Sequence, residues 1–345
     1  MPAKIAILKP DHLGDVVLAA PAVRRILAAH PGHDVDFLCA PSSARLVRWL
    51  FPEVRPVGVT FPHLDKTGAA RPAATPDLPE RYEFVFGLRS DDRMNDAYLS
   101  AQGQSGAFVA STHEEHETWS QKLLVERLCG PYSRSALFFG SRRPEFPTQP
   151  RTVGLCIAAG FVNNRWDAVA WLRLGRLLQS SGRRVKIVGG PREEGEAHLL
   201  RALLRLADAD VVLGGDDFDG FLRKIEQEVD VLVATDSGTA HVASLVKPIL
   251  SIFGPSPHRR YAPFGRQNRL IRRSLECSPC CQFARTTLNA CVTRECLAAL
   301  EPEAVLELLE DAPGAAPSRK AAPPYERIVG TSHLAAPASL AGRAP

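Results

Sequence analysis

The chain has 345 residues, of which 45% are hydrophobic, and its 42 basic and 38 acidic residues give a formal net charge of +4. This length exceeds what one hydrophobic core usually serves, so two globular domains are expected. No stripe of Lys and Arg with interleaved aromatic residues occurs, which excludes nucleic acid as an expected partner. There is no run of about 18 apolar residues, and the first apolar run is too short for a signal peptide. These features predict a cytoplasmic protein.

The first part of the sequence alternates apolar runs with helical patterns, which indicates β-α-β units and a parallel sheet. The expected elements are residues 5–8 (strand), 16–29 (helix), 35–39 (strand), 42–50 (helix), 82–88 (strand) and 118–129 (helix). In the last helix, Trp119, Leu123, Leu124 and Leu128 share one face. Residues 61–80 and 100–116 are rich in Pro, Gly, Ala and polar residues and are predicted to be loops.

Three prolines between residues 141 and 150 predict an extended connector and a domain boundary at 150. The alternation then restarts, and Asp167 is expected to cap a helix. The second series is 153–158 (strand), 168–180 (helix), 185–188 (strand), 193–207 (helix), 211–213 (strand), 218–228 (helix), 231–234 (strand), 239–245 (helix) and 249–253 (strand). Two such halves, 1–150 and 151–310, outline paired Rossmann-like domains that face a cleft. Residues 311–345, dominated by Ala and Pro, are predicted to form a disordered tail.

The loop after the first strand lacks a dinucleotide-binding pattern. A dehydrogenase would carry G-x-G-x-x-G there, whereas residues 9–15 contain one glycine, Gly14. Asp15 instead stands at the start of the helix, at the carboxyl end of the first strand, where open α/β sheets hold their ligands. Two interpretations stay open at this point, a helix cap and a functional carboxylate.

A second strand-to-helix turn, residues 235–241, is built of small and polar residues. Such a turn exposes backbone N–H groups at a helix N-terminus, where a diphosphate can bind. Asp236, Ser237 and Thr239 are candidates for hydrogen bonds to a sugar or phosphate. Ordinary capping by Ser or Asp and a structural role for His241 are the alternatives.

Five cysteines gather between residues 277 and 296, namely Cys277, Cys280, Cys281, Cys291 and Cys296. A reducing compartment argues against disulfides. A C-x-x-C pair followed by two more cysteines can supply the four thiolates of a tetrahedral metal site, and reduced cysteines without metal are the alternative. Cys39, Cys129 and Cys156 fall in apolar runs and are expected in the core.

Three motifs together carry a resemblance to a known family. They are Lys9-x-x-x-x-Gly14-Asp15, the segment 236–241, and residues 253–257 followed by Pro263-x-Gly265. Their order and spacing resemble the family 9 glycosyltransferases, the bacterial ADP-heptose heptosyltransferases and their relatives. The resemblance implies a GT-B fold with two Rossmann-like domains facing a central cleft. It further implies an inverting transfer of heptose from a nucleotide-sugar donor, typically ADP-heptose, to a hydroxyl acceptor.

The resemblance also implies roles for individual residues. Asp15 matches the proposed general base, and Lys9 a basic residue that stabilises the leaving phosphate or fixes the charge of Asp15. Asp236, Ser237, Gly238, Thr239 and His241 match the donor turn. Beside these matches, Arg165 is a donor-side candidate, and His12, Gly14 and Arg89 are acceptor-side candidates. No cofactor is required for catalysis. Many members carry a C-S-P-C stretch and some bind iron with it, which implies a structural Fe or Zn held by Cys277, Cys280, Cys291 and Cys296.

One departure from the family weakens the expectation about the sugar. The segment 159–166 has Asn164 where the family often has a lysine, and Arg165 is the candidate to replace it. Trp166 is expected to pack at the entry of the following helix.

The acceptor is not determined by the sequence. Lipopolysaccharide core, a protein and a small glycoside all fit, and a lipid acceptor would bring the protein to the inner-membrane surface. A homo-oligomer is compatible with the sequence. The alternative functions are a non-catalytic sugar-nucleotide-binding or assembly protein and a sugar-nucleotide epimerase or hydrolase of the same fold.

Overall fold

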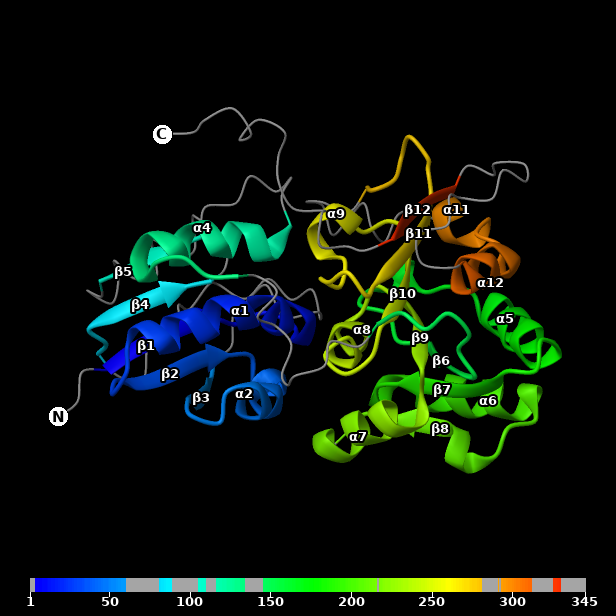
Figure 1. Ribbon diagram of the computed structural model, residues 1–345, viewed down its shortest axis with the longest axis horizontal. Helices are drawn as coiled ribbons and strands as arrows, with labels where there is room; N and C mark the ends of the chain where they lie inside the picture. The colour runs from blue at the N-terminus through cyan, green and yellow to red at the C-terminus, as the bar shows by residue number, and fades with distance from the viewer. Residues whose placement is uncertain are drawn as a thin grey trace. The chain divides into compact units, whose positions relative to one another are not determined.

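The computed structural model describes residues 4–59, 81–88, 105–109, 116–133, 145–215, 217–280, 291, 293–311 and 325–329 (Figure 1). Contacts along the chain group it into two compact units, Met1–Leu137 with Ala336–Pro345, and Phe138–Ala335. Each unit contains one sheet with helices packed against it. The α/β class predicted from the alternating pattern is therefore confirmed.

The first unit is built on a parallel sheet with the strand order β3-β2-β1-β4-β5. Its strands are β1 (Lys4–Lys9), β2 (Asp34–Cys39), β3 (Arg55–Gly58), β4 (Phe84–Gly87) and β5 (Gly106–Phe108), and its helices are α1 (Leu13–Ala29), α2 (Ala44–Leu50) after a 3₁₀ turn (Pro41–Ser43), and α4 (Glu117–Cys129). Strand β1 lies at the centre of the sheet, and all its residues after Lys4 are buried. A continuous apolar run such as Ile5–Leu8 is typical of a central parallel strand.

One sequence-based expectation for this unit was wrong. Residues 100–116 were predicted to be a loop but contain β5, a three-residue strand that starts with glycine and has no recognisable strand pattern.

The predicted helix 118–129 is present as α4, and its apolar face is not its buried face, because Leu123 and Leu128 are 45% and 40% exposed. Glu117 and Gln121 are buried instead, in a helix that packs against α1. The segment 61–80 lies outside the described residues.

The second unit contains a sheet with the strand order β12-β11-β10-β9-β6-β7-β8. Its strands are β6 (Thr152–Cys156), β7 (Arg184–Gly189), β8 (Val211–Leu213), β9 (Val231–Thr235), β10 (Ile249–Phe253), β11 (Arg269–Arg273) and β12 (Tyr325–Val329). Its helices are α5 (Ala168–Ser180), α6 (Glu194–Leu204), α7 (Phe218–Glu228), α8 (Gly238–Ala243), α9 (His258–Tyr261), α11 (Glu295–Ala298) and α12 (Pro302–Glu310), with 3₁₀ turns at Val162–Asn164, Pro191–Glu193 and Asp208–Asp210. All strand pairs are parallel except β11 with β12.

The core of the second unit joins helices α5, α6 and α12 to the inner strands of the sheet. Trp166 and Trp171 lie at its centre with their rings 4.9 Å apart in an edge-to-face arrangement. Trp166 is 2% exposed, and its Nε1 donates to the carbonyl oxygen of Leu300 at 3.2 Å. Trp166 is therefore a packing residue, as the sequence predicted.

Several boundaries of the second unit differ from prediction. The helix expected to reach residue 207 ends at Leu204, because Arg205 adopts a left-handed backbone with φ of 55°. Asp167 occupies the N-cap position of α5 without capping it, and its Oδ1 accepts from Arg294 at 3.1 Å. In the tail predicted to be disordered, Tyr325–Val329 forms β12, whose backbone bonds come from antiparallel pairing with β11. The other residues of the tail after Asp311 lie outside the described part of the chain.

Two helical glycines of this unit differ in the space around them. A Cβ on Gly175 of α5 would lie 2.7 Å from Leu204 Cδ1, whereas one on Gly195 of α6 meets nothing within 4 Å. We expect Gly175→Ala to lower the free energy of unfolding by about 1–3 kcal/mol, because Leu204 is buried and must move. Gly195→Ala should raise it by up to about 1 kcal/mol through helix propensity alone. Urea unfolding of the two variants measures both effects, and equal changes would contradict the packing described.

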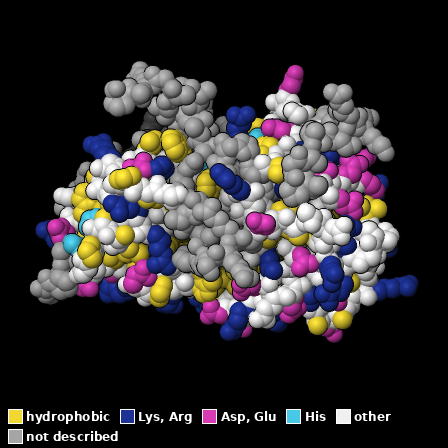
Figure 2. Space-filling model, in the orientation of Figure 1, with side chains coloured by type: hydrophobic (Ala, Val, Ile, Leu, Met, Phe, Trp, Pro, Cys, Tyr) yellow, Lys and Arg dark blue, Asp and Glu magenta, His cyan; other side chains and the backbone are white. Residues whose placement is uncertain are grey.

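The face of the molecule drawn in Figure 2 shows interspersed charges. On the face drawn in Figure 2, Lys and Arg side chains lie among Asp and Glu side chains and do not form one continuous field. Within the described residues, no helix combines the length and the apolar character needed to cross a membrane.

Candidate functional site

Asp15 lies in the first turn of α1, just beyond the carboxyl end of the central strand β1. The N-cap position of that helix is His12, so Asp15 is not the capping residue. The Asp15 side chain is 25% exposed, and its Oδ2 lies 3.9 Å from Nδ1 of His12. Gly14, which precedes Asp15 in the sequence, is buried. The structure therefore places a partly exposed carboxylate where the topology of an α/β sheet puts ligands.

Lys9, the last residue of β1, is buried and paired with two carboxylates. Its Nζ lies 3.1 Å from Asp11 Oδ2 and 3.1 Å from Glu117 Oε1 on α4. Burial alone lowers the pKa of Lys9, but the carboxylates of Asp11, Glu117 and Asp15 outweigh it and raise the pKa above its ordinary value. Of its two predicted roles, this geometry favours balancing the charge around Asp15 over a direct contact with a phosphate.

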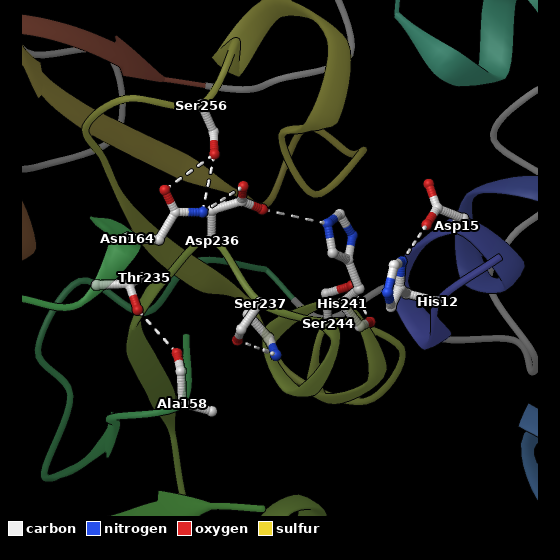
Figure 3. Close-up of polar contacts among 11 residues, drawn as sticks. His12, Asp15, Ala158, Asn164, Thr235, Asp236, Ser237, His241, Ser244 and Ser256 are labelled. Carbon is white, nitrogen blue, oxygen red and sulfur yellow. Dashed lines mark hydrogen bonds and ion pairs between the residues drawn. The ribbon is translucent and has the colours of Figure 1, made fainter. Parts of the chain in front are cut away.

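The turn between β9 and α8 holds the second group of predicted residues (Figure 3). Ser237 occupies the N-cap position of α8, and its Oγ accepts from the backbone N of Ala240 at 3.1 Å. The six-residue helix is too short for a full macrodipole, and the backbone N–H groups of Gly238 and Thr239 in its first turn have no partner within the helix. His241 is 4% exposed, and its Nε2 lies 4.0 Å from Asp236 Oδ1.

Asp236 belongs to a network that joins three loops, which we name the three-loop network: Asn164, Asp236 and Ser256 (Figure 3). Asn164 Nδ2 donates to Asp236 Oδ2 at 3.2 Å and lies 2.8 Å from Ser256 Oγ, while Ser256 Oγ donates to Asn164 Oδ1 at 3.1 Å. These residues follow β6, β9 and β10, which are neighbours in the sheet. The network therefore lies at the carboxyl edge of the central strands.

Two hydrogen bonds to backbone carbonyl groups hold the loops together at the same edge of the sheet. The N–H of Gly160 donates to the carbonyl oxygen of Asp236 at 3.0 Å, and Thr235 Oγ1 donates to the carbonyl oxygen of Ala158 at 2.8 Å. Burial raises the pKa of Asp236 to about 6, and the hydrogen bonds from Ser256 and Asn164 oppose this rise. Asp236 is thus a carboxyl group with neutral hydrogen-bond partners.

Two predicted site residues, Arg165 and Arg89, are not part of the groups described above. Arg165 follows Asn164 directly, but its guanidinium pairs with Glu196 on α6 at 3.6 Å and takes no part in the three-loop network. Arg89 lies outside the described residues.

The four predicted metal ligands line one pocket of the second unit. The lining residues are Asn163, Pro255, Cys277, Cys280, Cys291, Thr293, Arg294, Glu295 and Cys296. Burial, together with the neighbouring thiols of Cys280, Cys291 and Cys277, raises the pKa of Cys296 to about 11. Across the described ranges no three His, Cys, Asp or Glu side chains are arranged to hold a metal ion. Cys281 lies outside those ranges.

This cysteine pocket adjoins the three-loop network through the chain itself. Asn163 and Pro255 line the pocket, and the residues that follow them, Asn164 and Ser256, belong to the network. Arg294 also lines the pocket and donates to the carbonyl oxygen of Arg165 at 3.0 Å. Two loops therefore contribute to both features.

The comparison with protein families decides the class. Residues 131–291 match glycosyltransferase family 9 (heptosyltransferase), a range that includes the turn after β9 and the loop after β10. The matched segment, somewhat less than half of the chain, is thus similar to the family 9 glycosyltransferases. The resemblance inferred from the motifs is thus confirmed, and the protein is a glycosyltransferase.

Full-length relatives extend the similarity beyond that domain. Lipopolysaccharide heptosyltransferase 1 of Escherichia coli K12 is 23% identical over 320 residues, which are 79% of this chain and 94% of the relative. The structure of E. coli heptosyltransferase WaaC with ADP matches with a TM-score of 0.62 and 18% identity over 89% of this chain and 99% of that one. WaaC with ADP-2-deoxy-2-fluoro heptose matches with a TM-score of 0.59 and 19% identity over the same shares.

A third solved structure is an iron-containing dodecameric glycosyltransferase, TibC from enterotoxigenic E. coli. It matches with a TM-score of 0.54 and 13% identity over 89% of this chain and 76% of that chain. These likenesses show the fold, so the glycosyltransferase has the predicted GT-B architecture.

Sequence reasoning missed three polar residues that the structure brings to the predicted ones, two in the first unit and one in the second. Glu117 is 108 residues from its partner Lys9, and no pattern in the sequence links the two. Asp11 lies in the first loop, but no pattern in the sequence predicts that it pairs with Lys9. Ser256 stands in the motif 253–257, yet its place in the network depends on strand order, which that motif does not encode.

Proposed function

We propose that this glycosyltransferase transfers heptose from ADP-heptose to a hydroxyl acceptor with inversion at the anomeric carbon. The observation that carries the proposal is the polar edge formed by the loops after β6, β9 and β10, where the first N–H groups of α8 adjoin the three-loop network. Such an edge suits a diphosphate and a sugar. The WaaC structures with ADP and with an ADP-heptose analogue support this choice of donor.

In this proposal each side chain has a defined role. The acceptor hydroxyl attacks the anomeric carbon from the face opposite the diphosphate, and Asp15 accepts its proton. Lys9, held by Asp11 and Glu117, balances the charge around Asp15. The diphosphate leaves toward the backbone N–H groups of Gly238 and Thr239. His12 and Gly14 flank the acceptor side.

A ligand panel tests the donor. The purified protein is heated with ADP, UDP, GDP and CDP and with their available nucleotide sugars, and the shift in melting temperature is measured. ADP and ADP-heptose should give the largest shifts. A larger shift with another nucleotide would overturn the donor assignment. Release of ADP without a glycosylated acceptor in mass spectrometry would favour a hydrolase, and an isomerised free donor would favour an epimerase.

For the acceptor we propose a lipopolysaccharide core sugar, because the named E. coli relatives are lipopolysaccharide heptosyltransferases. Such an acceptor would place the enzyme at the inner membrane during turnover. Incubation with ADP-heptose and lipopolysaccharide truncated before its first heptose should produce a mass increase of one heptose.

We further propose that the cysteine pocket holds a structural Fe or Zn ion. Four thiols from two segments line the pocket, and thiolates are ligands that both metals take. TibC, a similar structure, is described as iron-containing. The ligands would be Cys277, Cys280, Cys291 and Cys296, and the metal would cross-link their segments without entering the reaction.

Metal analysis tests this site. The purified chain should contain about one Fe or Zn ion, and the double variant C277S/C280S should lose it and melt at a lower temperature. Cys129→Ala, outside the pocket, is the matched control and should keep the metal. A wild-type chain purified without chelators that contains neither metal would contradict the proposal.

A further inference from the structure

Asp236 has only neutral hydrogen-bond partners in the three-loop network. Its Oδ2 accepts from the amide of Asn164, and the hydroxyl of Ser256 completes the group. Across the described residues no Lys or Arg pairs with it. His241 Nε2 lies 4.0 Å from Oδ1, which is beyond hydrogen-bond distance.

Charged groups on the neighbouring elements are engaged elsewhere. On the β6 side, Arg165 pairs with Glu196 at 3.6 Å. On the β10 side, His258 lies 4.0 Å from Glu326, and burial lowers its pKa to about 4. Within the described residues no Lys or Arg side chain lies in ion-pair range of Asp236, and its partners in the three-loop network are uncharged.

This environment suits one part of a nucleotide sugar better than the other. A carboxylate with no cation beside it repels a diphosphate, because both groups are negatively charged. A sugar hydroxyl donates a charge-assisted hydrogen bond to the same carboxylate. The backbone N–H groups at Gly238 and Thr239 suit the diphosphate.

We infer that Asn164 and Ser256 are positioning residues that orient Asp236 so that it accepts hydrogen bonds from the hydroxyl groups of the donor sugar. Asn164 engages Oδ2 and leaves Oδ1 as the accepting atom on the side of His241 (Figure 3). Both positioning side chains are buried, at 2% and 5% exposure, so their orientations are fixed by packing. The inference rests on the proposed function, and within that function it makes Asp236 the residue that recognises the donor sugar.

The test compares two probes, ADP and ADP-heptose, by isothermal titration calorimetry. Asp236→Asn should weaken ADP-heptose binding about tenfold or more and ADP binding by less than about threefold, since only the sugar contact is lost. Asn164→Ala and Ser256→Ala should act in the same direction by about three- to tenfold. Ser256→Thr keeps the hydroxyl and should retain the wild-type ratio of the two affinities.

A matched control comes from the strand that leads to Ser256. Ser251 on β10 is 2% exposed, and its Oγ has no hydrogen-bond partner. Ser251→Ala removes a buried hydroxyl without touching the network and should leave both affinities unchanged. A merely structural role of Asn164 or Ser256 would weaken both probes together.

The pH dependence gives a second readout. An ionised Asp236 accepts hydrogen bonds better than a protonated one, so the affinity ratio of ADP-heptose to ADP should rise between pH 5 and pH 7.5. Asn164→Ala removes a hydrogen bond to the ionised form and should move the midpoint to higher pH. In Asp236→Asn this pH dependence should vanish.

The possible failures are distinguishable. A wild-type protein that binds neither probe would overturn the proposed function. If both probes bind and the ratio of the two affinities is unchanged in Asp236→Asn, the contact between Asp236 and the donor sugar is excluded, and the proposed function is not affected. Equal losses for both probes in Asn164→Ala would overturn the positioning role.

Discussion

Asp15→Asn is expected to lower the rate of sugar transfer by about 10²- to 10⁴-fold, the usual contribution of a general base. The amide keeps the shape of the side chain but cannot accept the proton of the acceptor hydroxyl. ADP affinity should be unchanged, because Asp15 belongs to the first unit and the donor turn to the second. Single-turnover kinetics and calorimetry with ADP measure the two properties separately.

The matched control for this variant is Asp34→Asn. Asp34 begins the neighbouring strand β2 and is exposed, so its replacement changes the net charge by the same amount without touching the first loop. It should leave transfer unchanged. Full activity in Asp15→Asn would exclude the carboxylate as the base, and a loss of ADP binding in that variant would indicate a misfolded protein.

Lys9→Ala is expected to destabilise the fold by about 3–5 kcal/mol, because it removes one partner of the buried ion pair between Lys9 and Glu117. Glu117 is 3% exposed and has Lys9 as its ion-pair partner at 3.1 Å. The double variant K9A/E117A should recover part of the loss, since it removes the carboxylate of this pair together with its cation. Urea unfolding of the two single variants and the double variant gives the coupling energy.

An exposed ion pair is the control for the Lys9 cycle. Arg173 and Glu303 lie 2.6 Å apart, with side chains 56% and 38% exposed. Arg173→Ala should change stability by less than about 1 kcal/mol.

The raised pKa of Lys9 means that the stabilisation by its ion pairs is complete below the ordinary lysine pKa and is lost only at higher pH. The Lys9 effect should therefore be constant between pH 6 and pH 9, and a loss within that window would contradict the pairing.

The sequence was most informative where local patterns control structure. Residues 211–213, 218–228 and 249–253 were predicted with their observed bounds, because apolar periodicity and turn residues define them. Short elements such as β5 and β12 were missed, since their backbone bonds come from distant strands.

The site residues also divide into those that local sequence predicts and those that depend on contacts between distant segments. The turn 236–241 could be recognised because its small residues are consecutive, whereas its link to Asn164 and Ser256 spans 72 and 92 residues. Such links depend on the order of strands in the sheet. The predicted replacement of the family lysine by Arg165 also depended on side-chain direction, and the guanidinium lies against Glu196.

The two loops shared by the cysteine pocket and the three-loop network have a practical consequence for enzymology. Asn163 and Pro255 face the thiols, and their immediate successors hold Asp236, so a shift of either loop moves both features together. A cysteine variant should therefore show an elevated KM for the donor even though no thiol touches it. In a mutational scan, the cysteines would be mistaken for donor-binding residues unless metal content were measured in the same samples.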